Sequence, residues 1–277
     1  MNHTAVYPRS ALAALVLVLV IGSVASASAV LFGDYYRLGD NDPGAMVGGI
    51  GNEATVDSGA WRLDLKRTNW PQYSGDVSPF AVGSKLSMSF INLPGTKSIY
   101  GSPSYYGRTG PSVALQQAYG LEAWVKTSTL EPVEGGYAVI VGAGNFGLYQ
   151  HKGDYVARVG TFEKVIGAAS TKQWTHVAYV RMYDQEEYFL NGVSVGQGKS
   201  GTPLATESKA FMVGGGVFGE TPDMLFNGLV DETRMFTYNP LSMGAFGPGD
   251  FLISVPEPMG MGMMGVCALL MVRRRSR

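Results

Sequence analysis

The sequence contains very little cysteine and histidine. Cys267 is the only cysteine, and there are three histidines among 277 residues. A single cysteine cannot form a disulfide within the chain, and so few Cys and His residues argue against a zinc site. The net charge is only −1, so the chain also lacks the excess of Lys and Arg that nucleic acids and anionic lipids attract. A stable fold therefore depends on a large apolar core, with a bound metal as an additional staple.

Long amphipathic helices are missing as well. Between Val30 and Ser254, no stretch keeps an apolar 3.6-residue period over three turns without Gly or Pro. Instead, 38 glycines separate short runs rich in Val, Tyr, Phe and Trp, a pattern typical of all-β proteins. The expected strands are DYYRLG, AWRLDL, KLSMSFI, YGLEAWVKT, YAVIVG, FGLYQ, DYVARVG, QWTHVAYVRM, EYFLN, VSVG, KAFMVGG and LFNGLVDETRMF. Serial antiparallel strands without crossover helices predict a sandwich or jelly roll.

Two local signals are specific enough to place residues. Asn191-Gly192 between EYFL and VSV predicts a two-residue type I′ hairpin turn, because both residues tolerate positive φ. Trp124 and Trp174 are expected in the core, since both lie in apolar strand segments. His176 is expected to be a hydrogen-bonded residue of the sheet.

The first 29 residues read as a secretory signal peptide, which is removed on export. Arg9 gives a positive start, ALAALVLVLVIGSVA is an apolar run, and Ala27 and Ala29 form a small-residue cleavage motif. The run is shorter than the ~20 residues that span a bilayer. Cleavage after Ala29 is the expectation, and a retained N-terminal anchor is the alternative.

The last residues, 251–277, carry a Val-Pro-Glu-Pro motif, a short apolar segment that could enter a membrane, and a basic cluster. These elements are Val255, Pro256, Glu257 and Pro258, then 259–272, then Arg273, Arg274, Arg275 and Arg277. Because cationic residues stay cytoplasmic, this tail would leave the preceding domain facing outward. The order of the three elements resembles the PEP-CTERM sorting signal. That resemblance implies processing by an exosortase, a membrane-embedded cysteine protease; a plain single-pass anchor is the alternative.

Residues 30–250 remain, and they suit one β-sandwich domain. Without Arg9 and the four C-terminal arginines, residues 30–258 hold 16 bases and 22 acids, a net charge of −6. Four segments resemble the LamG-like, concanavalin A-like jelly-roll domain: YGLEAWVKT at 119–127, QWTHVAYV at 173–180, EYFLNGVSV at 187–195 and FNGLVDETRMFTYNPLS at 226–242. ATVDSGAWRLDL looks like the first-strand region of that family. The resemblance implies an antiparallel jelly-roll sandwich.

The same resemblance implies a calcium site. Members often hold one Ca²⁺ at the rim of the sandwich through an acid near the first strand and another near the last. The matching residues are Asp57 in VDSG and Asp231 in LVDET, and carboxylates are ligands that calcium prefers. The alternatives are an Asx turn at Asp57 and a salt-bridged strand acid at Asp231. The oxygen-rich run at 40–44 is primarily a turn former.

Enzyme motifs occur only as strings. GVSVG at 192–196 matches GxSxG and GAGNFG at 142–147 matches GxGxxG, but no helix is expected after either, as their chemistry requires. Glycoside hydrolysis by retention needs two carboxylates about 5–5.5 Å apart, and the ExDxxE pattern of related glucanases is absent. Asp231 and Glu232 are adjacent, so strand alternation predicts opposite faces. No catalytic residue is expected.

Carbohydrate binding requires exposed aromatic rings. The loop GSPSYYGRTGPS presents Tyr105 and Tyr106 among Gly and Pro, and tyrosine offers a flat apolar face with a hydrogen-bonding tip; packing onto the sandwich is the alternative. The predicted function is a non-catalytic recognition or adhesion module of the cell envelope that binds a glycan, by analogy of fold. A structural matrix or protein-contact sandwich is the alternative, followed by a glycoside hydrolase.

The two end signals generate a first prediction. Protein isolated from its native host should begin at or close to Val30 and should lack the RRRSR tail, because both ends carry processing signals. Intact-mass spectrometry measures this directly. A chain that still begins at Met1, or that retains all 277 residues, would contradict it.

Overall fold

The structure is a computed structural model of the chain. It describes residues 32–81, 83–91, 99–101, 118–132, 136–143, 146–160, 162–199, 211–216, 224–238 and 248–252. The predicted signal peptide, Tyr105, Tyr106 and the predicted sorting signal lie outside these residues. Within the described ranges, no helix is both long and apolar enough for a membrane span.

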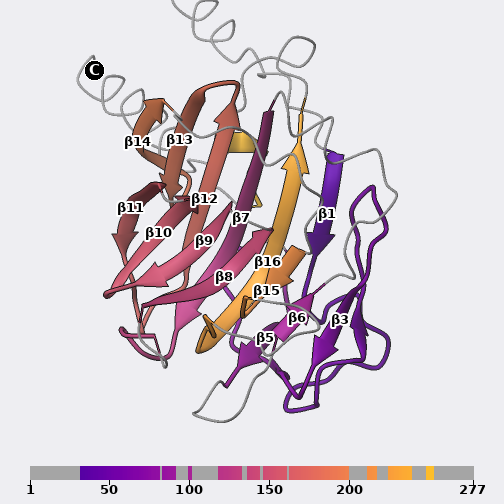
Figure 1. Cartoon of the computed structure of the whole chain (residues 1–277). Helices are drawn as coiled ribbons and strands as arrows, with labels where there is room; N and C mark the ends of the chain where they lie inside the picture. The colour runs from indigo at the N-terminus through magenta and orange to yellow at the C-terminus, as the bar shows by residue number, and fades with distance from the viewer. Residues whose placement is uncertain are drawn as a thin grey trace, which may run out of the picture.

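Two antiparallel sheets of eight strands lie face to face (Figure 1). Sheet A has the order β14-β13-β12-β7-β16-β5-β4, with β1 also paired to β16. Its strands are β1 (Phe32–Tyr36), β4 (Gln72–Ser74), β5 (Ser87–Phe90), β7 (Ala118–Thr127), β12 (Thr175–Met182), β13 (Gln185–Leu190), β14 (Val193–Lys199) and β16 (Gly228–Thr237). A single 3₁₀ turn, η1 (Pro248–Asp250), follows β16 among the described residues.

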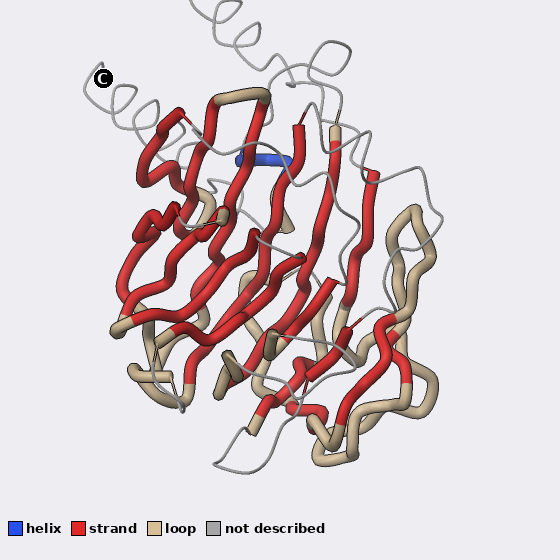
Figure 2. Tube along the Cα trace, in the orientation of Figure 1, coloured by secondary structure: helices blue, strands red, loops and turns tan. Residues whose placement is uncertain are grey.

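Sheet B has the order β11-β10-β9-β8-β15-β6-β3-β2. Its strands are β2 (Ala54–Thr55), β3 (Leu65–Thr68), β6 (Ile99–Gly101), β8 (Tyr137–Ala143), β9 (Phe146–His151), β10 (Asp154–Val159), β11 (Phe162–Ala168) and β15 (Phe211–Val213). The red strands of Figure 2 account for nearly all regular structure. The predicted all-β sandwich is therefore confirmed.

The strands missed by the sequence analysis are the short or edge ones. AWRLDL was expected as a strand, but only Leu65 of it belongs to β3, and β2, β4, β6 and β11 were not expected. β11 is an edge strand whose side chains are mostly exposed or half-buried, with only Ile166 buried. A strand that buries one side chain carries no alternating apolar pattern, because that pattern arises from burial of one face.

The main core lies between the two sheets and is rich in aromatic rings. Tyr36 of β1 stacks on Phe211 of β15 with ring centroids 5.5 Å apart, and Tyr119 of β7 meets the edge of Phe146 of β9 at 5.0 Å. Such pairs favour stacked or edge-on geometry and add to the burial energy of the rings. These contacts join the two sheets into one domain.

One tryptophan prediction is confirmed and the other is wrong. Trp124 is 2% exposed in β7. Trp174 precedes β12, is only half-buried, and donates its indole N–H to the Asp76 carboxylate at 2.8 Å. Its apolar neighbours in the sequence suggested burial, but the strand begins one residue later, at Thr175.

The predicted hairpin is confirmed. Asn191 has φ 51° and Gly192 has φ 75°, and Leu190 pairs with Val193 across the turn. Both turn residues therefore have the positive φ of a type I′ turn. The turn sets the register of β13 against β14.

We predict that Gly192→Val destabilises the domain by about 1–2 kcal/mol, because a β-branched residue is disfavoured at positive φ. Gly198→Val is the control, since Gly198 lies in strand β14 and an added Cβ there meets nothing within 4 Å. Urea denaturation of both variants measures the free energy of unfolding. Equal loss in the two variants would contradict the turn assignment.

Candidate functional site

Asp57 is buried beside the first strand, and its carboxylate is engaged with the backbone. Oδ1 accepts the N–H groups of Tyr35 at 2.9 Å and Gly59 at 2.6 Å, and Oδ2 accepts that of Leu63 at 2.7 Å. The bond to Gly59 is the Asx turn that the sequence allows. This carboxylate therefore ties the loop after Asp57 to β1.

Asp231 lies in β16 and is fully buried. Its Oδ2 accepts a hydrogen bond from the Ser84 hydroxyl at 2.8 Å, whereas its Oδ1 is buried without a hydrogen-bond partner. Burial, followed by the charge of Glu232, raises the pKa of Asp231 to about 8. The alternative of a salt-bridged acid at Asp231 finds no ion pair among the described residues, where the nearby Arg234 pairs with Glu122.

Asp231 and Glu232 do not alternate as a regular strand predicts. The register of β16 against β7 shifts between Asp231 and Arg234, and Glu232 has φ 44°. Such a bulge re-aims side chains, since one extra residue faces the partner strand. The charge of Glu232 contributes to the raised pKa of Asp231, so the two carboxylates interact. The bulge interrupts strand alternation at these residues, and the prediction of opposite faces is therefore wrong here.

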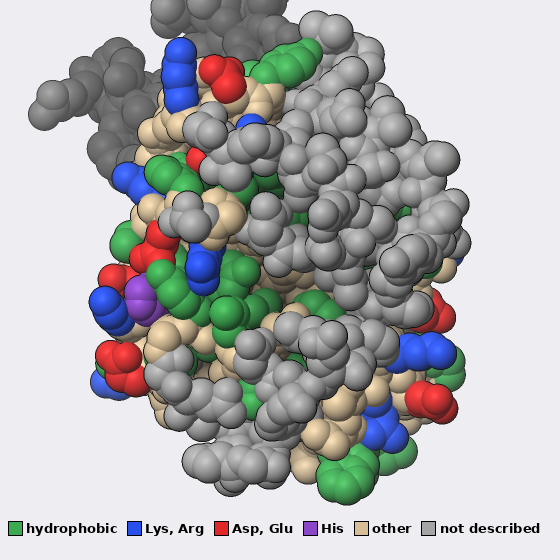
Figure 3. Space-filling view, in the orientation of Figure 1, with side chains coloured by type: hydrophobic (Ala, Val, Ile, Leu, Met, Phe, Trp, Pro, Cys, Tyr) green, Lys and Arg blue, Asp and Glu red, His purple; other side chains and the backbone are tan. Residues whose placement is uncertain are grey.

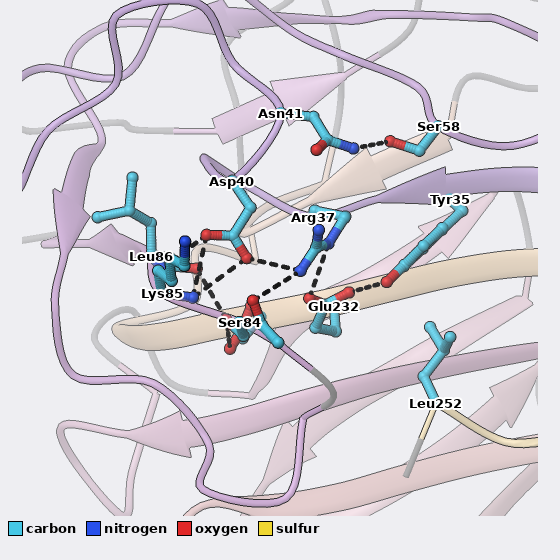
Figure 4. A network of polar contacts seen from close by, with 12 residues as sticks. Tyr35, Arg37, Asp40, Asn41, Ser58, Ser84, Lys85, Leu86, Glu232 and Leu252 are labelled. Carbon is cyan, nitrogen blue, oxygen red and sulfur yellow. Dashed lines mark hydrogen bonds and ion pairs between the residues drawn. The ribbon is translucent and has the colours of Figure 1, made fainter. Parts of the chain in front are cut away.

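A polar network surrounds the bulge (Figure 4). Glu232 accepts hydrogen bonds from the Tyr35 hydroxyl and from Arg37 Nε, the latter at 3.1 Å. Arg37 also pairs with Asp40 at 3.0 Å, and Asp40 accepts the backbone N–H groups of residues 85 and 86. Burial raises the pKa of Glu232, although Tyr35 and Arg37 oppose the shift. The network joins β1, β16 and the loop before β5.

The residues named for calcium fit that ion only in part. Asp231 keeps one buried oxygen without a partner, but Asp57 already accepts three backbone N–H groups. Across the described ranges, no group of three or more His, Cys, Asp or Glu residues could hold a metal ion. Calcium binding by Asp57 and Asp231 stays a prediction, and Asp231 is the residue on which a test depends.

A different feature stands out on the surface. Four large apolar side chains are exposed in neighbouring segments, and we call them the Trp70 platform: Met46 (67% exposed), Val47 (66%), Ile50 (53%) and Trp70 (66%). Figure 3 shows that hydrophobic side chains reach the surface at the lower edge of the face it draws. A monomeric protein rarely exposes a group of large apolar residues without a partner or ligand.

The platform has a defined backbone. Gly49 donates its N–H to the carbonyl of Met46 at 2.9 Å, and Gly48 has φ 78°. This is the positive φ that the third residue of a type II turn requires. Ile50 then pairs with Gln72 as an isolated antiparallel bridge. The turn and the bridge place Ile50 beside the segment that carries Trp70.

A buried carboxylate holds the platform from beneath. Asp42 accepts the Thr55 hydroxyl at 3.0 Å and the Val56 N–H at 2.8 Å with Oδ1, and the Tyr73 hydroxyl at 2.8 Å with Oδ2. The Tyr73 hydroxyl in turn accepts the N–H of Asn52 at 2.9 Å. Burial raises the pKa of Asp42 against these bonds. These bonds anchor the backbone from which the exposed side chains project.

Residues close to Trp70 in the sequence are polar. Asn69 and Gln72 are both exposed on either side of Trp70, and Asn69 adopts φ 58° while its carbonyl accepts a bond from Arg67. Amide side chains can both donate and accept hydrogen bonds. A flat apolar ring with amides beside it can stack on one face of a sugar and bind its hydroxyl groups.

The outer face of sheet B has a second aromatic cluster whose polar groups bind one another. Tyr137 donates to Glu163, His151 Nδ1 lies 3.2 Å from the same carboxylate, and Arg158 lies over the Tyr137 ring at 4.4 Å. Burial would raise the pKa of Glu163, but Tyr137 and His151 outweigh it, and the pKa is lowered. Their mutual pairing makes this cluster a weaker candidate than Trp70.

The sequence analysis did not single out Trp70. Its ligand candidates, Tyr105 and Tyr106, lie outside the described residues. The signal for Trp70 was available, since Asn-Trp-Pro at 69–71 places a large ring between two turn-forming residues. Exposure itself, however, follows from the pairing of two loops, which no local pattern reveals.

The fold and the comparisons agree on the class of protein. The chain is an antiparallel jelly-roll sandwich, and residues 102–243 match the concanavalin A-like lectin/glucanases superfamily. The chain belongs to this superfamily, as the four sequence segments predicted. No curated protein matches the sequence.

Solved structures with the same fold include carbohydrate-bound domains. Domain 4 of AbnA, a GH43 extracellular arabinanase from Geobacillus stearothermophilus in complex with arabinotriose, has a TM-score of 0.53 at 18% identity, covering 80% of this chain and 97% of that domain. The binding domain of botulinum neurotoxin DC in complex with SialylT has a TM-score of 0.50 at 11% identity, covering 74% and 47%. The same toxin domain with rat synaptotagmin II has a TM-score of 0.51 at 10% identity, covering 77% and 50%. This chain spans about half the length of the toxin domains, and the likeness concerns the fold alone.

The buried carboxyl group of Asp231 generates a pH prediction. Its pKa of about 8 lies above the ordinary 3.8, so the folded state holds the proton more tightly than the unfolded state does. This contribution to stability is present below pH 4 and is lost as the pH rises toward 8. Asp231→Asn mimics the protonated form and does not lose this contribution. Its melting temperature minus that of wild type should therefore increase as the pH rises from 5 to 8.5, measured with a chelator present.

Thermal melts of wild type, Asp231→Asn and the exposed control Asp184→Asn check this expectation. If the melting temperatures of wild type and Asp231→Asn differ by the same amount at every pH, the raised pKa is contradicted. Calcium added at pH 8 tests the metal prediction in the same melts. It should raise the melting temperature of wild type and not of Asp231→Asn, because a ligand stabilises only the form that binds it.

Proposed function

We propose that this protein is a non-catalytic extracellular module that binds a glycan through the Trp70 platform. The observation that carries the proposal is the indole of Trp70, 66% exposed on a loop that the buried Asp42 network fixes. A loop whose backbone is already ordered loses less conformational entropy on binding than a flexible loop does. The ring supplies stacking area, and Asn69 and Gln72 supply hydrogen bonds that orient the sugar.

The family and its structural neighbours support a carbohydrate ligand. The superfamily contains lectins and glucanases by its description, one neighbour holds arabinotriose, and another is complexed with SialylT. Those ligands belong to those proteins. For this chain they supply the first probes, a neutral arabinan oligosaccharide and a sialylated oligosaccharide.

The proposed role excludes catalysis. Three acids of sheet A are buried. Asp231 and Glu232 lie next to each other at the bulge, and Glu122 forms an ion pair with Arg234. A retaining glycosidase needs two carboxylates that both reach the sugar. None of these three side chains reaches solvent, which favours binding over hydrolysis.

We further propose that the protein is exported and sorted at the cell envelope. The support is the sequence of the two ends, a signal peptide at 1–29 and a PEP-CTERM-like tail at 251–277 for an exosortase. A surface location would bring the platform to polysaccharides outside the cell. The tail would hold the protein in the inner membrane only until processing.

The binding proposal predicts that Trp70→Ala weakens glycan binding at least about tenfold, since loss of a stacked ring costs about 1.4 kcal/mol or more. Glycan arrays identify the ligand, and isothermal titration calorimetry of wild type and variant measures the dissociation constant. Trp70 is exposed, so the substitution should leave the melting temperature within a few degrees of wild type.

Phe162→Ala is the matched control, because Phe162 is an exposed ring (41%) on β11, at the far edge of sheet B. Its affinity should equal that of wild type. Wild-type binding by Trp70→Ala would refute the platform as the glycan site. Loss of self-association in Trp70→Ala, with no glycan bound by wild type, would favour the alternative of a protein-contact sandwich.

A further inference from the structure

The segment at 248–252, which we call the strap, lies against the outer face of sheet A. Its 3₁₀ turn is the blue element in Figure 2, near the ends of the sheet-A strands. The N–H of Leu252 donates to Glu122 Oε2 at 2.9 Å, and the carbonyl of Leu252 accepts from Trp124 Nε1 at 2.8 Å. The carbonyl of Asp250 accepts from Arg234 Nη2 at 2.7 Å. Sheet A thus binds the strap through its backbone.

Between these bonds, the side chain of Phe251 enters an aromatic pocket. Phe251 is 6% exposed, and its ring meets the edges of Phe189 at 4.7 Å and His176 at 5.1 Å between centroids. It is a member of a buried cluster on this face that also contains Ala178 and Phe236. Removal of this phenyl ring from water stabilises the strap on the sheet.

The groups that receive the strap come from the three central strands. Glu122 of β7, His176 of β12 and Arg234 of β16 converge, since Arg234 pairs with Glu122 and His176 with Trp124 across the strands. Glu122 accepts from His176 Nε2 at 2.9 Å and from Arg234 Nε at 2.6 Å. His176 Nδ1 is buried without a hydrogen-bond partner. The fold of sheet A alone assembles this constellation.

The ionic state of Glu122 suits a hydrogen-bond acceptor. Burial would raise its pKa, but Arg234 and His176 outweigh burial, and the pKa of Glu122 is lowered. A buried carboxylate keeps its charge only when donors surround it, and the N–H of Leu252 is one of them. The charged site therefore favours an occupant that donates a backbone N–H.

We propose that the outer face of sheet A carries a peptide-binding site whose occupant is the chain's own Asp250-Phe251-Leu252. The site recognises the N–H and C=O of one residue, the C=O two residues earlier and the phenyl ring between them. Such recognition needs a peptide rather than a sugar, because backbone groups of the strap make all three hydrogen bonds. The strap is an intramolecular latch that fixes the C-terminal end of the domain on sheet A.

The latch is independent of glycan binding, since no residue of the Trp70 platform contributes to it. Its position matters because residues 253–277 follow directly. A latch that closes at Leu252 fixes the point on the domain from which those residues depart. Opening it would expose an aromatic pocket that fits the same short peptide from any source.

Hydrogen exchange of the full chain, followed by mass spectrometry, tests the latch. The Leu252 amide should exchange at least tenfold faster in Phe251→Ala and in Glu122→Gln than in wild type. Tyr183→Ala is the control, because Tyr183 is an exposed ring (44%) in the turn between β12 and β13. It should leave that amide unchanged. If Phe251→Ala does not fold, Phe251→Leu replaces it and should show a smaller increase.

Peptide binding is the second readout. A labelled Pro-Gly-Asp-Phe-Leu-Ile-Ser peptide should bind the full chain carrying Phe251→Ala, and should bind wild type at least tenfold more weakly, because there the strap occupies the site. The same peptide with Asp in place of Phe should not bind either protein. Equal exchange of the Leu252 amide in wild type and Phe251→Ala overturns the latch. Failure of the opened variant to bind the peptide overturns the peptide site.

Discussion

The pairing of β16 with its neighbours is the constraint on which the domain depends. One edge of β16 pairs with β7 along the length of the strand, and the other pairs with β5 at Gly228–Val230 and with β1 from Thr233 to Thr237. This last strand of the described chain therefore joins the first strand, β1, and β5 to β7 at the centre of sheet A. Its antiparallel ladder satisfies backbone groups that would otherwise be buried without partners.

The change of partner from β5 to β1 coincides with the bulge. The register shift lies at Asp231–Arg234, and Glu232 takes φ 44°. A non-glycine residue in that region costs of order 1–3 kcal/mol and persists only where its surroundings hold it. Here Tyr35 and Arg37 hold Glu232. The same bulge leaves Asp231 buried beside a second acid, Glu232. Ionisation of Asp231 is therefore unfavourable at the place where the first and last strands meet.

The sequence predicted those features that local chemistry determines. Asn191-Gly192 dictates its own turn, and the apolar runs of β7, β8 and β12 mark buried strands. Features that depend on distant contacts were missed or misplaced. Trp174 lies among apolar residues as a core tryptophan does, yet it is only half-buried and donates to Asp76. Trp70 lies between turn-forming residues, but its exposure follows from the pairing of two loops. Regular strand alternation predicted opposite faces for Asp231 and Glu232. The bulge changed their orientation, and it depends on the pairing of β16 with other strands.

The residues that fix the backbone of the platform are different from the residues that form its exposed surface. Asp42, Thr55 and Tyr73 fix the loop from inside, whereas Met46, Val47, Ile50 and Trp70 only project from it. Substitutions at these four outward positions remove no buried contact of the network. Surface positions of this kind usually change stability by less than about 0.5 kcal/mol. The exposed surface of this loop can therefore change from one sequence to the next while the jelly roll beneath it stays folded.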